Sequence, residues 1–116
     1  MAFADIELAD HLRVLEEVFW SRRRPPVQIR DKVREGQRIT GHFIELFFVR
    51  PVWSRPGELT EEPIAKLQYV RTCDHWRVFW QRGNGQWYRY EPCRDAPSLS
   101  LALQVVHEDA YQCFFG

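Results

Sequence analysis

The chain has 116 residues, 45% of them hydrophobic, and its formal net charge is zero. This composition is that of a soluble globular protein, excludes a wholly disordered chain, and suits one domain over residues 1–116. Its apolar runs fall short of the roughly 20 residues of a membrane-spanning helix, and its acidic N-terminus lacks the pattern of a secretory signal. Three cysteines without CxxC spacing are typical of reduced thiols. We therefore expect a cytoplasmic protein that does not enter the membrane.

The charges are unevenly distributed along the chain. Both ends are acidic and the middle is basic, and fourteen of the sixteen basic residues are arginine. Arginine stacks on aromatic rings and binds phosphates or carboxylates with two parallel hydrogen bonds. Overall neutrality removes the long-range steering of a strongly basic nucleic-acid-binding protein. The sequence therefore allows a basic face on a neutral molecule.

The first predicted element is a helix over residues 5–20, with Asp5 as its N-cap. Its apolar residues recur at the spacing of one helical face: Leu8, Leu12, Leu15 and Phe19. The helix is expected to end before Pro25, because proline disfavours helical angles in the preceding residue. Arg22, Arg23 and Arg24 then fall at the C-terminal end, where cations stabilise the helix dipole. A phosphate-binding role for these three arginines is the alternative.

Five strands are predicted next, over residues 33–40, 42–50, 64–71, 76–82 and 86–90. The second is almost wholly apolar, so we expect a central strand buried on both faces. Residues 52–63 are expected to form a surface loop, and a second helix to run from its cap Ser98 to about Glu108. The apolar tail over residues 111–116 is expected to dock on the sheet. The prediction is an α+β fold of two layers, with an N-terminal helix, an antiparallel meander of about five strands and a C-terminal helix.

The hairpin over residues 69–90 holds three of the five tryptophans and three of the four tyrosines. If Asn84-Gly85 is a two-residue turn, Arg82 pairs with Trp87 and Trp80 with Arg89. We favour this register because Asn-Gly readily adopts positive φ angles. If residues 83–85 all form the loop, one face instead carries Arg77, Phe79, Gln81, Trp87 and Arg89. A slip of one residue thus reverses which side chains are buried.

Short strings along nearly the whole chain resemble one family of small bacterial proteins, known as domain of unknown function number 3024. The strings are Arg23-Arg24-Pro25-Pro26, Ile29-Arg30-Asp31, Pro63-Ile64-Ala65-Lys66, Tyr69-Val70-Arg71, Trp76 to Arg82 with Trp87 and Tyr90, and Cys113-Phe114-Phe115-Gly116. The resemblance implies a bacterial protein that stands alone as one domain. It implies no activity, so it supplies no catalytic residues.

The residues themselves predict no catalytic site, no metal site and no cofactor. Cys73, Asp74 and His75 form the one close cluster of ligand types, but neighbours in a strand turn point apart and no second pair stands at zinc-finger spacing. The serines lie outside a GxSxG motif, and a glycine-rich phosphate loop is missing. A metal-free ribonuclease with His42 or His75 as its base remains the enzymatic alternative. The chain is more typical of a protein that binds than of one that transforms its ligand.

The predicted binding surface lies on the sheet face that the two helices leave uncovered. Its residues are Arg77, Arg82, Trp87 and Arg89, extended by Arg22, Arg23 and Arg24. Tryptophan and arginine are enriched in the hot spots of protein interfaces, so we expect a protein partner or a second copy of the chain. Single-stranded nucleic acid is the alternative, because bases stack on aromatic rings while cations hold the phosphates. A third interpretation is that the tryptophans belong to the core and the arginines to an ordinary solvated rim.

Overall fold

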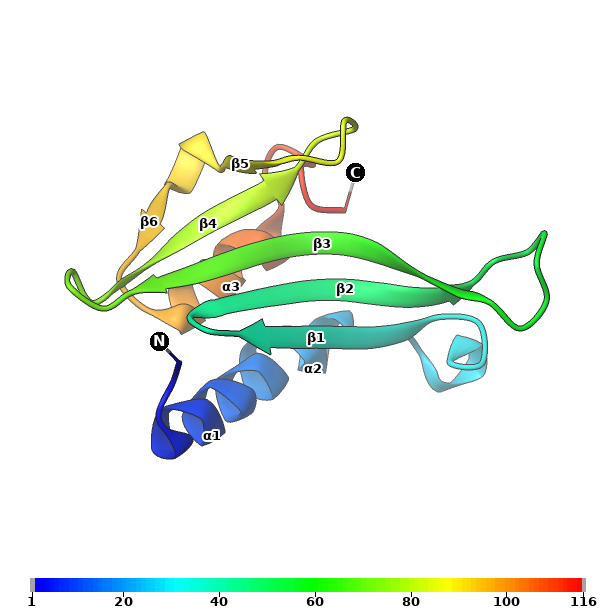
Figure 1. Ribbon diagram of the computed structural model, residues 1–116, viewed down its shortest axis with the longest axis horizontal. Coiled ribbons are helices and arrows are strands. Elements are labelled where there is room, and N and C mark those ends of the chain that lie inside the picture. Colours follow the sequence, from blue (N-terminus) through cyan, green and yellow to red (C-terminus); the bar gives the residue numbers. More distant parts are fainter. Residues whose placement is uncertain (1, 116) are drawn as a thin grey trace.

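The computed structural model describes residues 2–115 and has the predicted α+β architecture (Figure 1). Within these residues six strands form one antiparallel sheet in the order β1-β2-β3-β4-β5, and β6 also pairs with β4. The strands are β1 Arg34–Thr40, β2 Phe43–Pro51, β3 Leu59–Val70, β4 His75–Gln81, β5 Trp87–Arg89 and β6 Asp95–Ala96. The helices are α1 Asp5–Val14, the π-helix η1 Leu15–Trp20, α2 Ser21–Arg23, α3 Leu99–Glu108, and the 3-10 turns η2 Val27–Ile29 and η3 Glu91–Cys93. None of the helices in this part of the chain is long and apolar enough to cross a membrane.

The first helix is longer than predicted and includes a π-helical turn. Its N-cap is Ala4 rather than Asp5, and the Ala4 amide donates to Oε1 of Glu7 at 2.9 Å. The helix continues through η1 and α2 and ends at Arg24, whose backbone is extended as expected before Pro25. Phe19 and Trp20 are adjacent, yet both are buried.

Strands β2 and β3 pair along a longer stretch than the sequence predicted. β3 begins at Leu59, so Glu61 and Glu62, which were expected in a loop, instead pair with β2. A β-bulge interrupts the ladder, because Leu46 pairs with Ala65 while Phe47 pairs with Pro63. Proline has no amide hydrogen to donate, and a bulge is one of the few places where an inner strand tolerates it.

The hairpin between β4 and β5 adopts the register that we did not favour. Gln81 pairs with Trp87, and residues 83–85 all form the loop. The Gly85 amide donates to the Arg82 carbonyl at 2.9 Å, and Gly85 has a φ of 81°. This is a three-residue loop that ends in a left-handed glycine. The predicted pairing of Trp80 with Arg89 is wrong, because Trp80 pairs with Tyr88.

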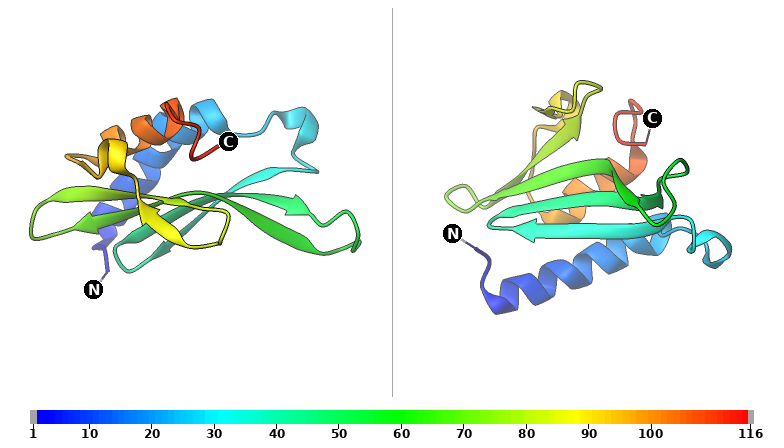
Figure 2. Two further views of the ribbon diagram at one scale, coloured as in Figure 1. Left: turned by 90° about the horizontal axis from the view of Figure 1, so that it is seen from above. Right: turned by 45° about the vertical axis from the view of Figure 1, so that its right-hand side comes forward.

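The core lies between one face of the sheet and a layer formed by α3, the end of the first helix and the C-terminal tail (Figure 2). Ile44, Leu67 and Val78 are in register on β2, β3 and β4, and all three are fully buried. Ser98 caps α3 as predicted, and its Oγ accepts a hydrogen bond from the Leu101 amide at 3.2 Å. The tail docks as expected, since the Phe114 ring lies 4.8 Å from that of Tyr90.

Candidate functional site

The face of the sheet opposite α3, which Figure 1 shows from the front, is not covered by a helix of the described chain. Two cross-strand rows lie on it: Phe43, Gln68, Arg77 and Asp95, and then Arg38, Glu45, Lys66, Phe79 and Arg89. Gln81 and Trp87 form a further pair, and Phe47 stands two residues beyond Glu45. We call these twelve residues the open face. Most of them are half-buried, whereas the alternating residues of the same strands form the core.

Aromatic rings and cations are interleaved on the open face. Nζ of Lys66 lies 4.7 Å from the ring centroid of Phe43 and 5.9 Å from that of Trp87. The guanidinium carbon of Arg89 lies 5.7 Å from the Phe79 centroid. Such contacts contribute about 0.5–1 kcal/mol each at exposed sites. These contacts also hold the long Lys66 and Arg89 side chains against the rings of the sheet surface.

Carboxylates of the same face form ion pairs with most of these cations. Glu45 lies between Arg38 and Lys66, with N–O distances of 3.0 and 4.0 Å. Asp95 accepts a hydrogen bond from Arg89 at 2.8 Å. Arg77 differs, because it forms no ion pair with another residue of the stretch 2–115. The Nε atoms of Arg77 and of Arg89 are both buried without a hydrogen-bond partner. The open face therefore carries four cations and two carboxylates, and Arg77 is the cation that has no carboxylate partner within the described residues.

A family model matches residues 4–116, which is almost the whole chain. The chain belongs to the DUF3024 family. The family is described as a domain of unknown function, which confirms the resemblance seen in the sequence. Neither the curated proteins nor the solved structures contain a match to the chain.

In this DUF3024 chain the structure brings together three of the predicted binding residues. Arg77, Trp87 and Arg89 share the open face, as the three-residue loop requires. Arg82 points to the other side of the hairpin, where its guanidinium carbon lies 5.0 Å from the Trp80 centroid and 4.2 Å from that of Tyr88. Arg82 is thus separated from the other three by the sheet itself.

The three consecutive arginines lie on the helix side, away from the open face. Arg22 donates to the Val18 carbonyl and to Gln104, and Arg23 donates to the backbone carbonyl and Nδ1 of His107. Arg24 binds the carboxylates of Glu16 and Glu35. These contacts join the end of the first helix to α3 and β1. The predicted extension of the sheet surface by Arg22, Arg23 and Arg24 is therefore not seen.

Sequence reasoning missed the contribution of β2 to this surface. We expected a strand buried on both faces, but Phe43 and Glu45 are only half-buried while Ile44 and Leu46 are fully buried. Glu45 is the signal that was available, since a charged residue inside an apolar run indicates that one face reaches solvent. Lys66 on β3 belongs to the same row and was also missed.

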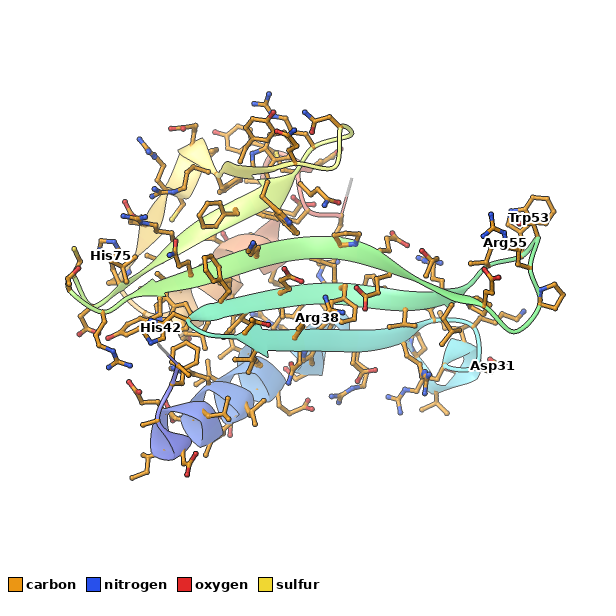
Figure 3. All side chains as sticks on the ribbon, in the orientation of Figure 1. Asp31, Arg38, His42, Trp53, Arg55 and His75 are labelled. Atoms are coloured by element: carbon orange, nitrogen blue, oxygen red, sulfur yellow. The ribbon has the colours of Figure 1, made fainter. Side chains whose placement is uncertain are left out.

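The two histidines considered for catalysis do not converge. Both lie at the same end of the sheet (Figure 3), but His75 faces Asp95 across 3.3 Å while the His42 ring packs 5.1 Å from that of Phe3. Asp74 accepts a hydrogen bond from the Tyr69 hydroxyl at 2.6 Å. Within residues 2–115 no three histidine, cysteine or acidic side chains are placed to share a metal ion. His42, Asp74 and His75 therefore each make their own local contact and do not form one shared site.

Proposed function

We propose that this DUF3024 chain is a non-catalytic binding module whose open face docks on a protein partner or on a second copy of itself. The observation that carries the proposal is the uncovered sheet face, on which Phe43, Phe79 and Trp87 stand half-exposed among cations and carboxylates. Aromatic and arginine side chains of this kind are the usual anchors of protein interfaces. The proposal keeps the cytoplasmic location and bacterial origin that the sequence led us to expect.

The charge pattern favours a protein over a nucleic acid. Arg38, Lys66 and Arg89 each have a carboxylate partner on this chain, and Glu45 stands between two of them. A phosphate backbone laid across the open face would meet that carboxylate, whereas a protein surface can present charges of either sign. Among the cations of the open face, Arg77 is the one without a carboxylate partner in the described part of the chain, and a carboxylate of the binding partner would neutralise it.

Single-stranded nucleic acid is the second candidate, because three half-exposed rings and an arginine without an ion pair share one face. Fluorescence anisotropy of labelled single-stranded RNA and DNA, at low and at physiological salt, separates the two proposals. Binding that persists at physiological salt and is lost in Trp87→Ala would favour nucleic acid, and its salt slope would count the phosphate contacts. Binding that occurs only at low salt would be non-specific attraction to the arginines.

The first prediction concerns Trp87. Trp87→Ala removes the largest ring of the open face, so it should weaken partner binding or self-association by about tenfold or more. Its melting temperature should fall by only a few degrees, because the ring is half-buried rather than in the core. Self-association is measured by sedimentation velocity at rising concentration. Partner binding is measured by capture on the immobilised chain.

The matched control is Trp53→Ala, because Trp53 is 94% exposed at the far tip of the β2–β3 loop (Figure 3). A protein retained by the wild type and by Trp53→Ala, but lost by Trp87→Ala and by Arg77→Glu, supports the proposal. Identical retention and sedimentation for all four proteins would refute it. Unfolding of Trp87→Ala would show that the ring belongs to the core. Retention and sedimentation of Arg77→Glu would then be the test of the proposed surface.

A further inference from the structure

We infer that a cavity on the helix side binds a small organic anion, with a phosphate or carboxylate group on an apolar body. The cavity has a volume of about 330 Å³, and its wall includes Arg22, Arg23, Arg24, Arg50, Phe48 and Phe115. We call it the arginine cavity. It lies between the end of the first helix, β2 and the C-terminal tail, so it is separate from the open face. Its volume falls in the range of small-molecule sites.

The charge of the arginine cavity is not balanced by its own wall. Four arginines line it and no acidic residue does. Arg24 and Arg50 are paired with glutamates outside the wall. Arg22 and Arg23 instead donate only to neutral acceptors within the described chain, namely carbonyl oxygens, the Gln104 amide oxygen at 2.6 Å and the ring of His107 at 3.1 Å. Two positive charges therefore remain beside the cavity.

Neighbouring groups keep these two charges unbalanced. The pKa of His107 is lowered by its burial and by the nearby Arg22 and Arg23, so the ring stays neutral and accepts the hydrogen bond from Arg23. The guanidinium of Arg23 also stacks on the ring of Phe115, with 3.8 Å between its central carbon and the ring centroid. Arg23 is thereby held at the edge of the cavity. A fixed guanidinium loses little freedom when an anion binds.

The rest of the wall is apolar and suits the body of the ligand. The rings of Phe48 and Phe115 lie 6.3 Å apart, and two prolines and two aliphatic side chains from residues 25–33 complete the surface. A bare inorganic anion would leave this surface in contact with water, whereas an apolar group would cover it. A second cavity of the same volume is lined by Glu7, Asp10 and Asp74 and would repel an anion. The combination of arginines and phenyl rings is therefore specific to the arginine cavity.

The experiment titrates the full chain with four probes and follows binding by calorimetry and by amide NMR shifts. Phenyl phosphate and benzoate carry both halves of the inferred ligand, inorganic phosphate carries only the charge, and benzyl alcohol carries only the ring. We expect at least one of the first two to bind with a Kd on the order of 1 mM or below. The other two should bind about tenfold more weakly, because each lacks one of the two contributions. Comparison of phenyl phosphate with benzoate identifies the preferred head group.

Variants locate the binding. Arg22→Gln removes an unbalanced guanidinium from an exposed side chain and should weaken binding of the phenyl anion about tenfold. Arg13→Gln is the matched control, because Arg13 lies on the same helical stretch but is paired with Asp10 and Glu17 away from the cavity. If Arg22→Gln does not fold, Arg23→Gln takes its place, because Arg23 carries the other unbalanced charge. Unchanged affinity in the folded variant, equal binding of inorganic phosphate, or no binding of either phenyl anion would each overturn the inference.

Discussion

At the scale of single residues, Gly36 on the edge strand β1 leaves space that the Phe47 ring of β2 fills. Gly36 pairs with Phe47, whose ring leans over the glycine and is only 8% exposed. A Cβ added at residue 36 would lie 2.8 Å from Cδ2 and 3.0 Å from Cζ of that ring. The glycine therefore serves packing here, because the space of a side chain is filled from the neighbouring strand.

Gly36→Ala is accordingly predicted to destabilise the chain by about 1 kcal/mol. Overpacking against the ring costs about 1–3 kcal/mol, which exceeds the roughly 0.4–1 kcal/mol gained from a less flexible unfolded backbone. Urea unfolding measures the difference. In a Phe47→Leu background the ring is gone, so the same change should cost less. An equal cost in both backgrounds would show that the ring is not the cause.

At the scale of elements, the β4–β5 hairpin shows how burial selects a register. Tyr90 is 2% exposed and packs on Phe114, and its amide donates to the Val78 carbonyl. The register that we favoured would have turned Arg89 toward the core beside Trp80. Burying an unpaired guanidinium costs more than an Asn-Gly turn gains. The chain therefore takes the longer loop and keeps Arg89 on the open face.

The loop supplies a direct prediction for the hairpin. Gly85→Ala should lower the free energy of unfolding by about 1 kcal/mol, because residue 85 has a φ of 81° that alanine adopts only with strain. Gly83→Ala is the control, since neither its φ nor a neighbouring atom opposes a side chain there. Denaturant midpoints of the two variants test this. Equal midpoints would argue against the left-handed glycine in solution.

At the scale of the whole molecule, tertiary packing sets the protonation of two histidines. Burial lowers the pKa of His11, whose ring packs edge-on to Phe3 and Trp76 at 4.5 and 5.1 Å. Burial and then the charges of Arg22 and Arg23 lower the pKa of His107. Both rings are therefore kept neutral by contacts that exist only in the folded chain.

Stability should consequently fall as the pH drops from about 7 to about 5. Below the ordinary histidine pKa of about 6.5, the unfolded chain takes up protons that the folded chain resists, and this favours unfolding. The stabilising contribution of the neutral histidines is complete above the pKa of the unfolded chain. It decreases as the pH falls below that pKa, and it is lost once the pH has fallen through the lowered pKa values of the folded chain. Replacing both histidines by glutamine should flatten the pH dependence of urea unfolding in this range. A slope as steep as that of the wild type would contradict the prediction.

Much of the fold follows from the sequence because it depends on local patterns. The burial of Leu15 and Phe19, the extended residue before Pro25 and the cap at Ser98 depend on neighbouring residues, and each is confirmed. Leu12, which was expected on the same helical face, is instead 41% exposed. The meander order needs only short connections between successive strands. Membership of the DUF3024 family was equally readable from strings along the chain.

Only the tertiary structure decided which face each side chain occupies. The register of Trp87 and Arg89 depends on burying Tyr90 against a tail more than twenty residues away. The exposure of Phe43 and Glu45 depends on the helices covering a single face. The two possible registers differ by one residue, and the two possible exposures of β2 differ by whether a helix layer covers its second face. A local sequence pattern allows both alternatives in each case. The free energy of burial, summed over the whole molecule, selects between them.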